Sequence, residues 1–83
     1  MKLWMRMGDM GEYQDHDDIE GVAEELWESH VANVTRTHRF GVSSDGFEQD
    51  NHISLFWGDD EASPERPLTD DEISYINDYL STH

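Results

Sequence analysis

Carboxylates are the most abundant chemically active side chains in this sequence. Asp and Glu total 20 against 5 Lys and Arg, so the formal net charge at pH 7 is −15. Such groups can transfer protons, bind cations or contact a basic partner. They concentrate in two stretches. The first contains Asp17, Asp18, Glu20, Glu24, Glu25 and Glu28, and the second contains Asp59, Asp60, Glu61, Glu65, Asp70, Asp71 and Glu72.

Acid–base catalysis is the first chemistry that these carboxylates could perform. A general acid needs a carboxyl group buried enough to raise its pKa, whereas these groups fall on predicted solvated helix faces or in loops. The sequence also contains no Gly-x-Ser-x-Gly, no cysteine, no P-loop and no Gly-x-Gly-x-x-Gly. We therefore predict that the protein is not an enzyme and uses no cofactor.

Metal binding is the second chemistry, because five histidines accompany the carboxylates. Residues 15–18, Asp-His-Asp-Asp, are too close in sequence for all their side chains to converge on one ion. His30 ends the apolar stripe of a predicted helix, where we expect it to cap the core or to meet the helix C-terminal dipole. His38 and His52 fall on predicted strands and could approach each other, but two ligands make a weak site. We predict no metal site.

Charge and composition narrow the class of partner. One lysine and four arginines cannot neutralise many phosphates while twenty carboxylates repel them, so direct nucleic-acid binding is not expected. No apolar run approaches the ~20 residues of a membrane span, and residues 1–10 lack the apolar segment of a signal peptide. The absence of cysteine removes the disulfide framework of small secreted proteins. We expect a cytoplasmic protein with a single small acidic domain over residues 1–83 and no membrane partner.

Apolar periodicity predicts the elements that position these residues. Residues 2–7 alternate as a half-buried strand does, and residues 12–16 are expected to form a loop. Residues 18–30 place apolar side chains at helical spacing on one face. Asp17 and Glu20 are spaced as in a capping box, which predicts Asp17 as the N-cap. The apolar face of this helix contains Ile19, Val22, Ala23, Leu26, Trp27 and His30.

The middle of the chain predicts a β-hairpin. Residues 34–42 alternate and are rich in β-branched and aromatic types, and residues 47–57 resume the alternation. Asp45-Gly46 between them is typical of a two-residue hairpin turn. A longer and looser loop over residues 43–51 fits the polar residues there equally well.

A second helix follows an acidic, proline-containing connector over residues 58–67. Thr69 is the predicted N-cap, Glu72 completes a capping box, and Leu68 packs against Ile73 as a hydrophobic staple. The order strand, helix, strand, strand, helix predicts an α+β domain. We expect two layers, in which a three-stranded antiparallel sheet carries both helices on one face. The core-facing residues of the second helix are Ile73, Ile76, Tyr79 and Leu80.

Aromatic side chains are expected to supply much of the core of so small a domain. Trp4 and Phe56 point away from the apolar sides of their predicted strands. If that face of the sheet is open, both are candidate interface anchors. The predicted core cluster contains Trp27, Phe40, Leu55, Trp57, Ile73 and Ile76.

The density of negative charge indicates a use for the carboxylates. In a helix, residues 17–28 span ~18 Å, which is one charge per ~3 Å and close to the ~3.4 Å per phosphate along one DNA strand. Like charges at helical spacing destabilise a helix, so local stability does not explain them. We predict binding to a basic nucleic-acid-binding protein or ribonucleoprotein complex. The predicted partner-binding residues are Asp17, Asp18, Glu20, Glu24, Glu25, Glu28, Asp59, Asp60, Glu61, Asp70 and Asp71.

In size, charge and lack of catalytic motifs, the whole chain resembles small phage-encoded anti-defence proteins that mimic DNA. This class includes the uracil-DNA glycosylase inhibitor, restriction inhibitors and acidic anti-CRISPR proteins. The resemblance is one of class features, and no motif residues are shared. It implies stoichiometric inhibition of a bacterial defence complex in the host cytoplasm, by blocking its DNA or guide-RNA channel.

Two other functions fit the same composition. Halophilic proteins are also rich in Asp and Glu and poor in lysine, and Lys2 is the single lysine of this chain. In that case the acidity serves solvation alone. The third candidate is a small acidic regulatory domain that contacts a basic partner through the edge of its hairpin. The sequence is also compatible with a homodimer.

Overall fold

The computed structural model describes the chain in four stretches, which are residues 1–7, 11–31, 33–34 and 53–83. Within them the chain forms four strands and two helices. In chain order the elements are β1 (Lys2–Met7), β2 (Gln14–His16), α1 (Ile19–Glu28), β3 (Ile53–Gly58), β4 (Pro64–Arg66) and α2 (Asp70–Thr82). Neither helix of this part of the chain is long and apolar enough to span a membrane.

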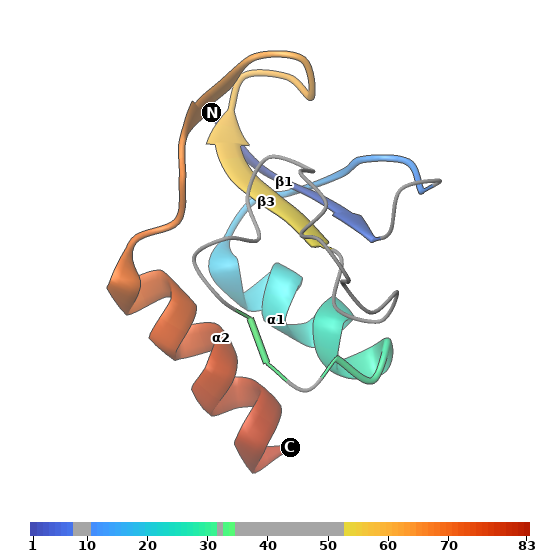
Figure 1. Ribbon diagram of the computed structural model, residues 1–83, viewed down its shortest axis with the longest axis vertical. Coiled ribbons are helices and arrows are strands. Elements are labelled where there is room, and N and C mark those ends of the chain that lie inside the picture. Colours follow the sequence, from blue (N-terminus) through green and yellow to red (C-terminus); the bar gives the residue numbers. More distant parts are fainter. Residues whose placement is uncertain (8–10, 32, 35–52) are drawn as a thin grey trace, which may run out of the picture.

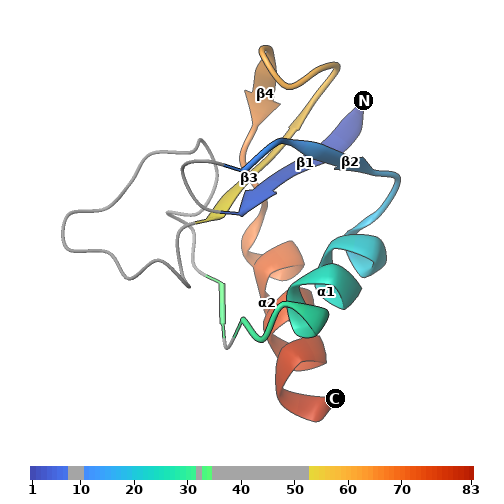
Figure 2. The same ribbon diagram turned by 90° about the vertical axis from the view of Figure 1, so that its right-hand side faces the viewer.

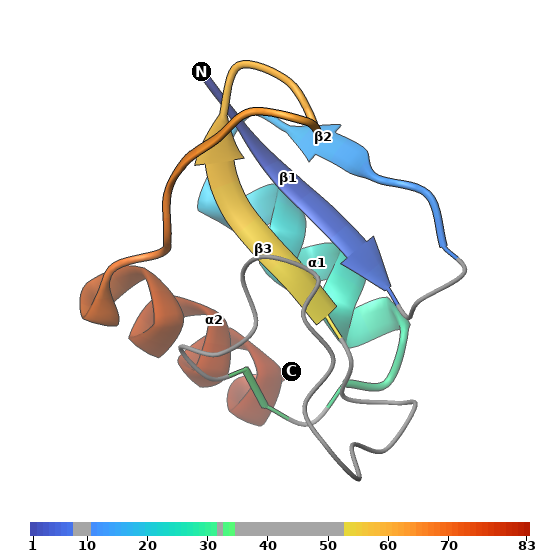
Figure 3. The same cartoon turned by 45° about the horizontal axis from the view of Figure 1, so that its top comes forward.

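The strands form one antiparallel sheet in the order β2-β1-β3-β4. The two longest strands, β1 and β3, lie side by side at its centre (Figure 3). Both helices lie on the same side of the sheet, where α1 contacts β1 and β2, and α2 packs along α1 (Figures 1 and 2). The α+β class and the antiparallel sheet with two helices are therefore confirmed.

The predicted number and order of strands are wrong, because two short strands flank the central pair. β2 falls where residues 12–16 were expected to form a loop, and β4 falls inside the expected connector over residues 58–67. Three residues are too few for an alternating pattern to show in the sequence. β4 also begins at Pro64, which an edge strand tolerates because it needs no inward-facing N–H there.

The predicted hairpin falls largely outside the described residues. Val34 is the first residue of the expected strand over 34–42, and it belongs to no strand. Residues 35–42, the Asp45-Gly46 turn and the alternative loop over 43–51 lie outside the described part, as do His38 and His52.

The central strands bury one face against the helices, as their alternation predicts. Leu3 and Met5 of β1 lie opposite Trp57 and Leu55 of β3, so the apolar side chains of the two strands share a face. This face and the helices enclose a single cluster. Its buried members are Leu3, Met5, Val22, Ala23, Leu26, Val31, Val34, Ile53, Leu55, Leu68, Ile73 and Ile76, with Met7, Ile19, Trp57, Tyr79 and Leu80 packed against it.

Half of the predicted core cluster is confirmed and one member is wrong. Leu55, Ile73 and Ile76 are buried, and Trp57 is partly buried against the same cluster. Trp27 is 43% exposed, because the smaller side chains of α1 already fill the space under the sheet and the indole lies at the edge of the apolar stripe. Phe40 lies outside the described residues.

Both ends of α1 differ from the sequence prediction. The N-cap is Asp18, whose side chain accepts a hydrogen bond from Gly21 N at 3.0 Å, whereas Asp17 lies one residue outside the helix. At the other end His30 adopts a left-handed conformation (φ 63°) after the C-cap. The His30 and Val31 amides donate to carbonyls one turn back, which makes a Schellman motif. His30 is exposed, so it does not cap the core as expected.

A single side chain fastens residues 33–34 to α2. The Asn77 amide accepts a hydrogen bond from Val34 N at 2.7 Å and donates one to Val34 O at 2.9 Å. Asn77 thus satisfies both backbone groups of Val34 as a neighbouring strand would. The pairing holds the Val34 side chain in the buried cluster.

The start of α2 forms the predicted capping box. Thr69 Oγ1 accepts a hydrogen bond from Glu72 N, and Glu72 Oε1 accepts one from Thr69 N at 2.8 Å. The Glu72 carboxylate also accepts from the Trp57 indole at 3.0 Å and from Arg66 Nη1 at 3.1 Å. Glu72 therefore joins β3, β4 and α2 through one carboxylate.

Replacement of Glu72 by glutamine should remove a pH-dependent part of the stability. Burial raises the pKa of Glu72, but the hydrogen bonds from Arg66, Thr69 and Trp57 outweigh it and hold the pKa below 4.5. A lowered folded-state pKa stabilises the fold above the unfolded-state value, and this contribution is lost as the pH falls through the folded-state value. At pH 7 we expect Glu72→Gln to cost about 1 kcal/mol of unfolding free energy, because glutamine can still close the capping box but accepts weaker hydrogen bonds from Arg66 and Trp57.

Urea unfolding of the two proteins from pH 7 to pH 3 measures this difference. It should shrink as the pH falls through the lowered pKa of folded Glu72, because the wild-type carboxylate then gains a proton and its charged hydrogen bonds are lost. A difference that stays constant over the whole range would contradict a charged role for Glu72.

The face of the sheet opposite the helices is also occupied, contrary to the prediction of two open anchors. Phe56 points away from Leu55 as expected, but it is only 1% exposed. The Tyr13 ring packs edge-on against it, with 5.4 Å between centroids. Trp4, which lies opposite Phe56 in the register, is half-buried and donates its indole N–H to Gly58 O at 3.1 Å. Phe56 is therefore part of a second, smaller packed face rather than an exposed contact residue.

Candidate functional site

The carboxylates around α1 do not form one continuous ridge. Asp17 turns towards β1, where it forms an ion pair with Lys2, and Asp15 lies 3.8 Å from the same ammonium group. The side chains of Lys2, Asp15 and Asp17 are exposed, so their pairing costs little desolvation energy. The hydrogen bond and the positive charge of Lys2 lower the pKa of Asp17. Asp17 is thus already paired within the domain.

Two further acidic residues of the predicted ridge also have local roles. Asp18 caps the helix. Glu25 faces β2, with Oε1 at 3.4 Å from His16 Nε2. In the orientation of its amide that satisfies both side chains, Gln14 donates to Glu25 Oε2 at 2.8 Å. Through these contacts Glu25 holds β2 against α1.

The remaining three carboxylates, Glu20, Glu24 and Glu28, form what we call the α1 ridge. They repeat every four residues, and they lie near Tyr75 and Tyr79 of α2. Glu20 Oε2 accepts a hydrogen bond of 3.5 Å from the Tyr75 hydroxyl. Partial desolvation raises the pKa of Tyr79, and the negative field of the ridge raises it further, chiefly through Glu24. The ridge therefore imposes a negative potential across the junction of the two helices.

Glu24 and Glu28 are the carboxylates of the ridge most open to a partner. Both are exposed, and neither makes a hydrogen bond or ion pair with another described residue. Repulsion between carboxylates four residues apart weakens an isolated helix. A cationic partner would relieve that repulsion on binding.

Exposed aromatic rings lie beside the α1 ridge. Trp27 is 43% exposed and Tyr75 is 41% exposed. The Trp27 indole lies edge-on to the His83 ring, with 6.4 Å between centroids, and His83 stacks on Tyr79 at 3.9 Å. We call these four residues, Trp27, Tyr75, Tyr79 and His83, the aromatic strip. Trp and Tyr are enriched among the residues that dominate binding energy at protein interfaces.

Sequence reasoning missed the aromatic strip, because it assigned Trp27 to the core. A signal was present in the spacing. Trp27 follows Glu20 by seven residues and Glu24 by three, so it shares their side of the helix as well as adjoining the apolar stripe. Whether Trp27 is buried in the core or exposed beside the ridge depends on where α2 packs. The sequence of α1 does not reveal that packing.

The second predicted acidic group is split between two places. Asp59, Asp60 and Glu61, which we call the turn cluster, lie in the turn between β3 and β4, at the end of the domain away from the helices (Figure 1). Asp60 accepts a hydrogen bond from Ala62 N at 2.8 Å, and Asp59 lies 3.9 Å from the amino group of Met1. The turn cluster is therefore a separate surface from the α1 ridge.

Asp70 and Asp71 occupy the first turn of α2, beyond β4. Both are exposed. Their negative charges interact favourably with the positive end of the helix dipole. This local role explains the acidic residues at both positions, so binding to another protein is not needed to account for them.

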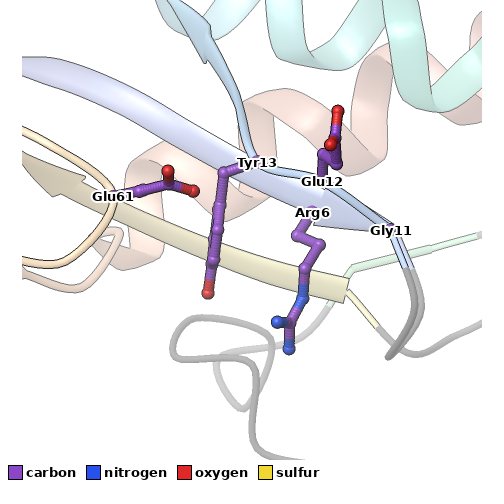
Figure 4. Close-up of a pocket in the computed structure, with 5 residues that line it drawn as sticks. All are labelled: Arg6, Gly11, Glu12, Tyr13 and Glu61. Atoms are coloured by element: carbon purple, nitrogen blue, oxygen red, sulfur yellow. The ribbon is translucent and has the colours of Figure 1, made fainter.

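A pocket of about 460 Å³ lies on the side of the sheet away from the helices. The Arg6 guanidinium sits over the Tyr13 ring at 5.0 Å from its centroid, and the Tyr13 side chain lies between Arg6 and Glu61 (Figure 4). Gly11 and Glu12 complete the lining. Within the described stretches, no group of three or more His, Cys, Asp or Glu residues could hold a metal ion.

No family model matches this chain, and neither a curated protein nor a solved structure is significantly similar to it.

Proposed function

We propose that this protein is a stoichiometric inhibitor that occupies the nucleic-acid-binding surface of a basic partner. The partner is a nucleic-acid-binding protein or ribonucleoprotein of a bacterial defence system, as the class resemblance implies, and the inhibitor would come from a phage. The observation that supports this proposal most is that exposed aromatic rings lie beside the α1 ridge. This surface combines two exposed carboxylates, Glu24 and Glu28, which make no hydrogen bond or ion pair within the described part of the chain, with side chains typical of interface anchors.

Charge supports this proposal more than shape does. A net charge of −15 on 83 residues repels nucleic acid and attracts basic surfaces over a Debye length of ~8 Å at physiological ionic strength. The α1 ridge carries one charge every four residues, which is about 6 Å along the helix axis. This is a lower linear density than one charge per ~3 Å, so the ridge is not a replica of a phosphate backbone. The proposal therefore rests on competition for the same basic side chains.

Competition with nucleic acid tests the proposal. The immobilised protein is first incubated with lysate at low salt, and the retained proteins are eluted in a salt gradient and identified. The recovered partner is then loaded with a labelled DNA or RNA, and the inhibitor is titrated in. We expect displacement of the nucleic acid at a ratio of one inhibitor to one binding site, with an affinity that falls as salt rises.

Three outcomes would contradict the proposal. A ternary complex that holds nucleic acid and inhibitor with neither weakened would exclude competition. Inactivation of the partner at substoichiometric amounts would indicate an enzyme. Cooperative unfolding that occurs only in molar salt would favour the halophilic interpretation of the acidity.

A further inference from the structure

The aromatic strip adds a second chemistry to the negative charge of the α1 ridge. In a domain this small, most aromatic surface is needed for the core, yet Trp27 and Tyr75 remain about two-fifths exposed. They come from different helices that pack on each other, so the strip is part of a well-ordered surface. Exposed indole and phenol rings attract cations to their faces.

Contacts along the junction place carboxylates next to these rings. Glu20 contacts Tyr75 through the 3.5 Å hydrogen bond. Glu24 precedes Trp27 by three residues, which makes the two side chains neighbours on the helix surface. The same Glu24 raises the pKa of Tyr79 through its negative charge. Glu24 thus lies near two rings of the strip, those of Trp27 and Tyr79.

A planar guanidinium interacts with the carboxylates and the aromatic rings together better than an ammonium group does. It donates in a fork to a carboxylate while its face stacks on an aromatic ring, and it is more weakly hydrated. A lysine ammonium is compact and strongly hydrated, so it gains from the charge but little from the rings. The strip and the ridge together therefore distinguish between the two cations.

The domain already contains this combination once. The Arg66 guanidinium lies 5.1 Å from the centre of the Trp57 ring, and its Nη1 is 3.1 Å from Glu72 Oε1. The Trp57 indole itself donates to Glu72 Oε2 at 3.0 Å. An indole, a carboxylate and a guanidinium thus associate within this fold. Trp27 and Glu24 present the first two groups to solvent.

We infer that the aromatic strip and the α1 ridge form a docking face for an arginine-rich segment of the partner, and that this face selects arginine over lysine. The inference rests on the proposed binding to a basic surface, and it specifies which cationic side chain of that surface is recognised. Charge complementarity supplies the attraction, and the rings of Trp27 and Tyr75 supply the selection.

Two synthetic peptides of equal length and charge, deca-arginine and deca-lysine, test the selection by isothermal titration calorimetry at low salt. We expect deca-arginine to bind about tenfold more tightly, from stacking on one or two exposed rings. Trp27→Leu should lower the deca-arginine affinity about fivefold and leave the deca-lysine affinity unchanged. Trp27→Tyr is the matched control, because it keeps a ring and should keep most of the preference. Circular dichroism checks that each variant is folded.

Equal affinities of the wild-type protein for the two peptides would overturn the inference. So would an equal loss of both affinities in Trp27→Leu, which would show that the indole acts through the fold. In either case salt-sensitive binding of the peptides would leave the proposed function standing. Absence of binding to both peptides would contradict the inference and the proposed function together.

Discussion

Simultaneous replacement of Glu20, Glu24 and Glu28 by lysine should abolish binding to the basic partner while the domain stays folded. The three side chains are exposed, and among the described residues only Glu20 takes part in a hydrogen bond, the long one from Tyr75. Reversal turns three attractions into three repulsions at the proposed centre of the interface. We expect an affinity loss of at least about a hundredfold at fixed ionic strength, given the coupling energies of close interfacial charge pairs.

A matched charge reversal separates the ridge from net charge. Lysine at Asp59, Glu61 and Glu65 changes the net charge by the same amount, at the β3–β4 end of the domain, and leaves Asp60 to hold its turn. We expect this variant to bind only severalfold more weakly, through lost long-range attraction. Calorimetry with the recovered partner measures both variants. Equal losses would show that the α1 ridge is no more than a solvated face of an acidic protein.

Replacement of Phe56 by alanine should remove most of the stability of the domain. Phe56 is 1% exposed and packs against Tyr13 on the face of the sheet opposite the helices. Truncation of a buried phenylalanine costs about 3–5 kcal/mol through lost burial and a residual cavity. Small domains have about 5–15 kcal/mol of stability in total, and one of this size is near the lower limit.

Urea unfolding followed by circular dichroism measures this loss. Phe56→Leu keeps most of the volume and should cost less than about 1.5 kcal/mol. Tyr75→Ala removes an exposed ring and should change stability by about 0.5 kcal/mol or less. A Phe56→Ala variant with a near-native midpoint would show that the second face of the sheet contributes little to the fold.

The elements with strong local signals could be predicted from the sequence. The alternation of residues 2–7 gives β1, and the Thr69–Glu72 capping box gives the start of α2, because both depend only on neighbours in the chain. β2 and β4 could not be predicted. Each is a three-residue edge strand whose existence depends on pairing with a central strand. No local pattern encodes that pairing.

The same division applies to the candidate site. The sequence locates every carboxylate, and the spacing of Glu20, Glu24 and Glu28 places them on one side of a helix. It does not show that Asp17 pairs with Lys2, fifteen residues away, or that Glu25 faces His16. These contacts depend on how the sheet meets the helix. Local spacing predicts which carboxylates share a side of the helix. Tertiary packing determines which of them remain available to a partner.

The central pairing of β1 with β3 determines the order in which this chain can fold. Lys2 pairs with Gly58, and Met7 pairs with Ile53, so the middle of the sheet joins segments about fifty residues apart. Closing so large a loop costs chain entropy before the two strands make any stabilising contact. Folding is therefore slow. During synthesis β1 cannot complete its pairing with β3 until residue 58 has been added. The helix α1 can form in that interval, because its hydrogen bonds are local, and we expect it to shield β1 until β3 arrives.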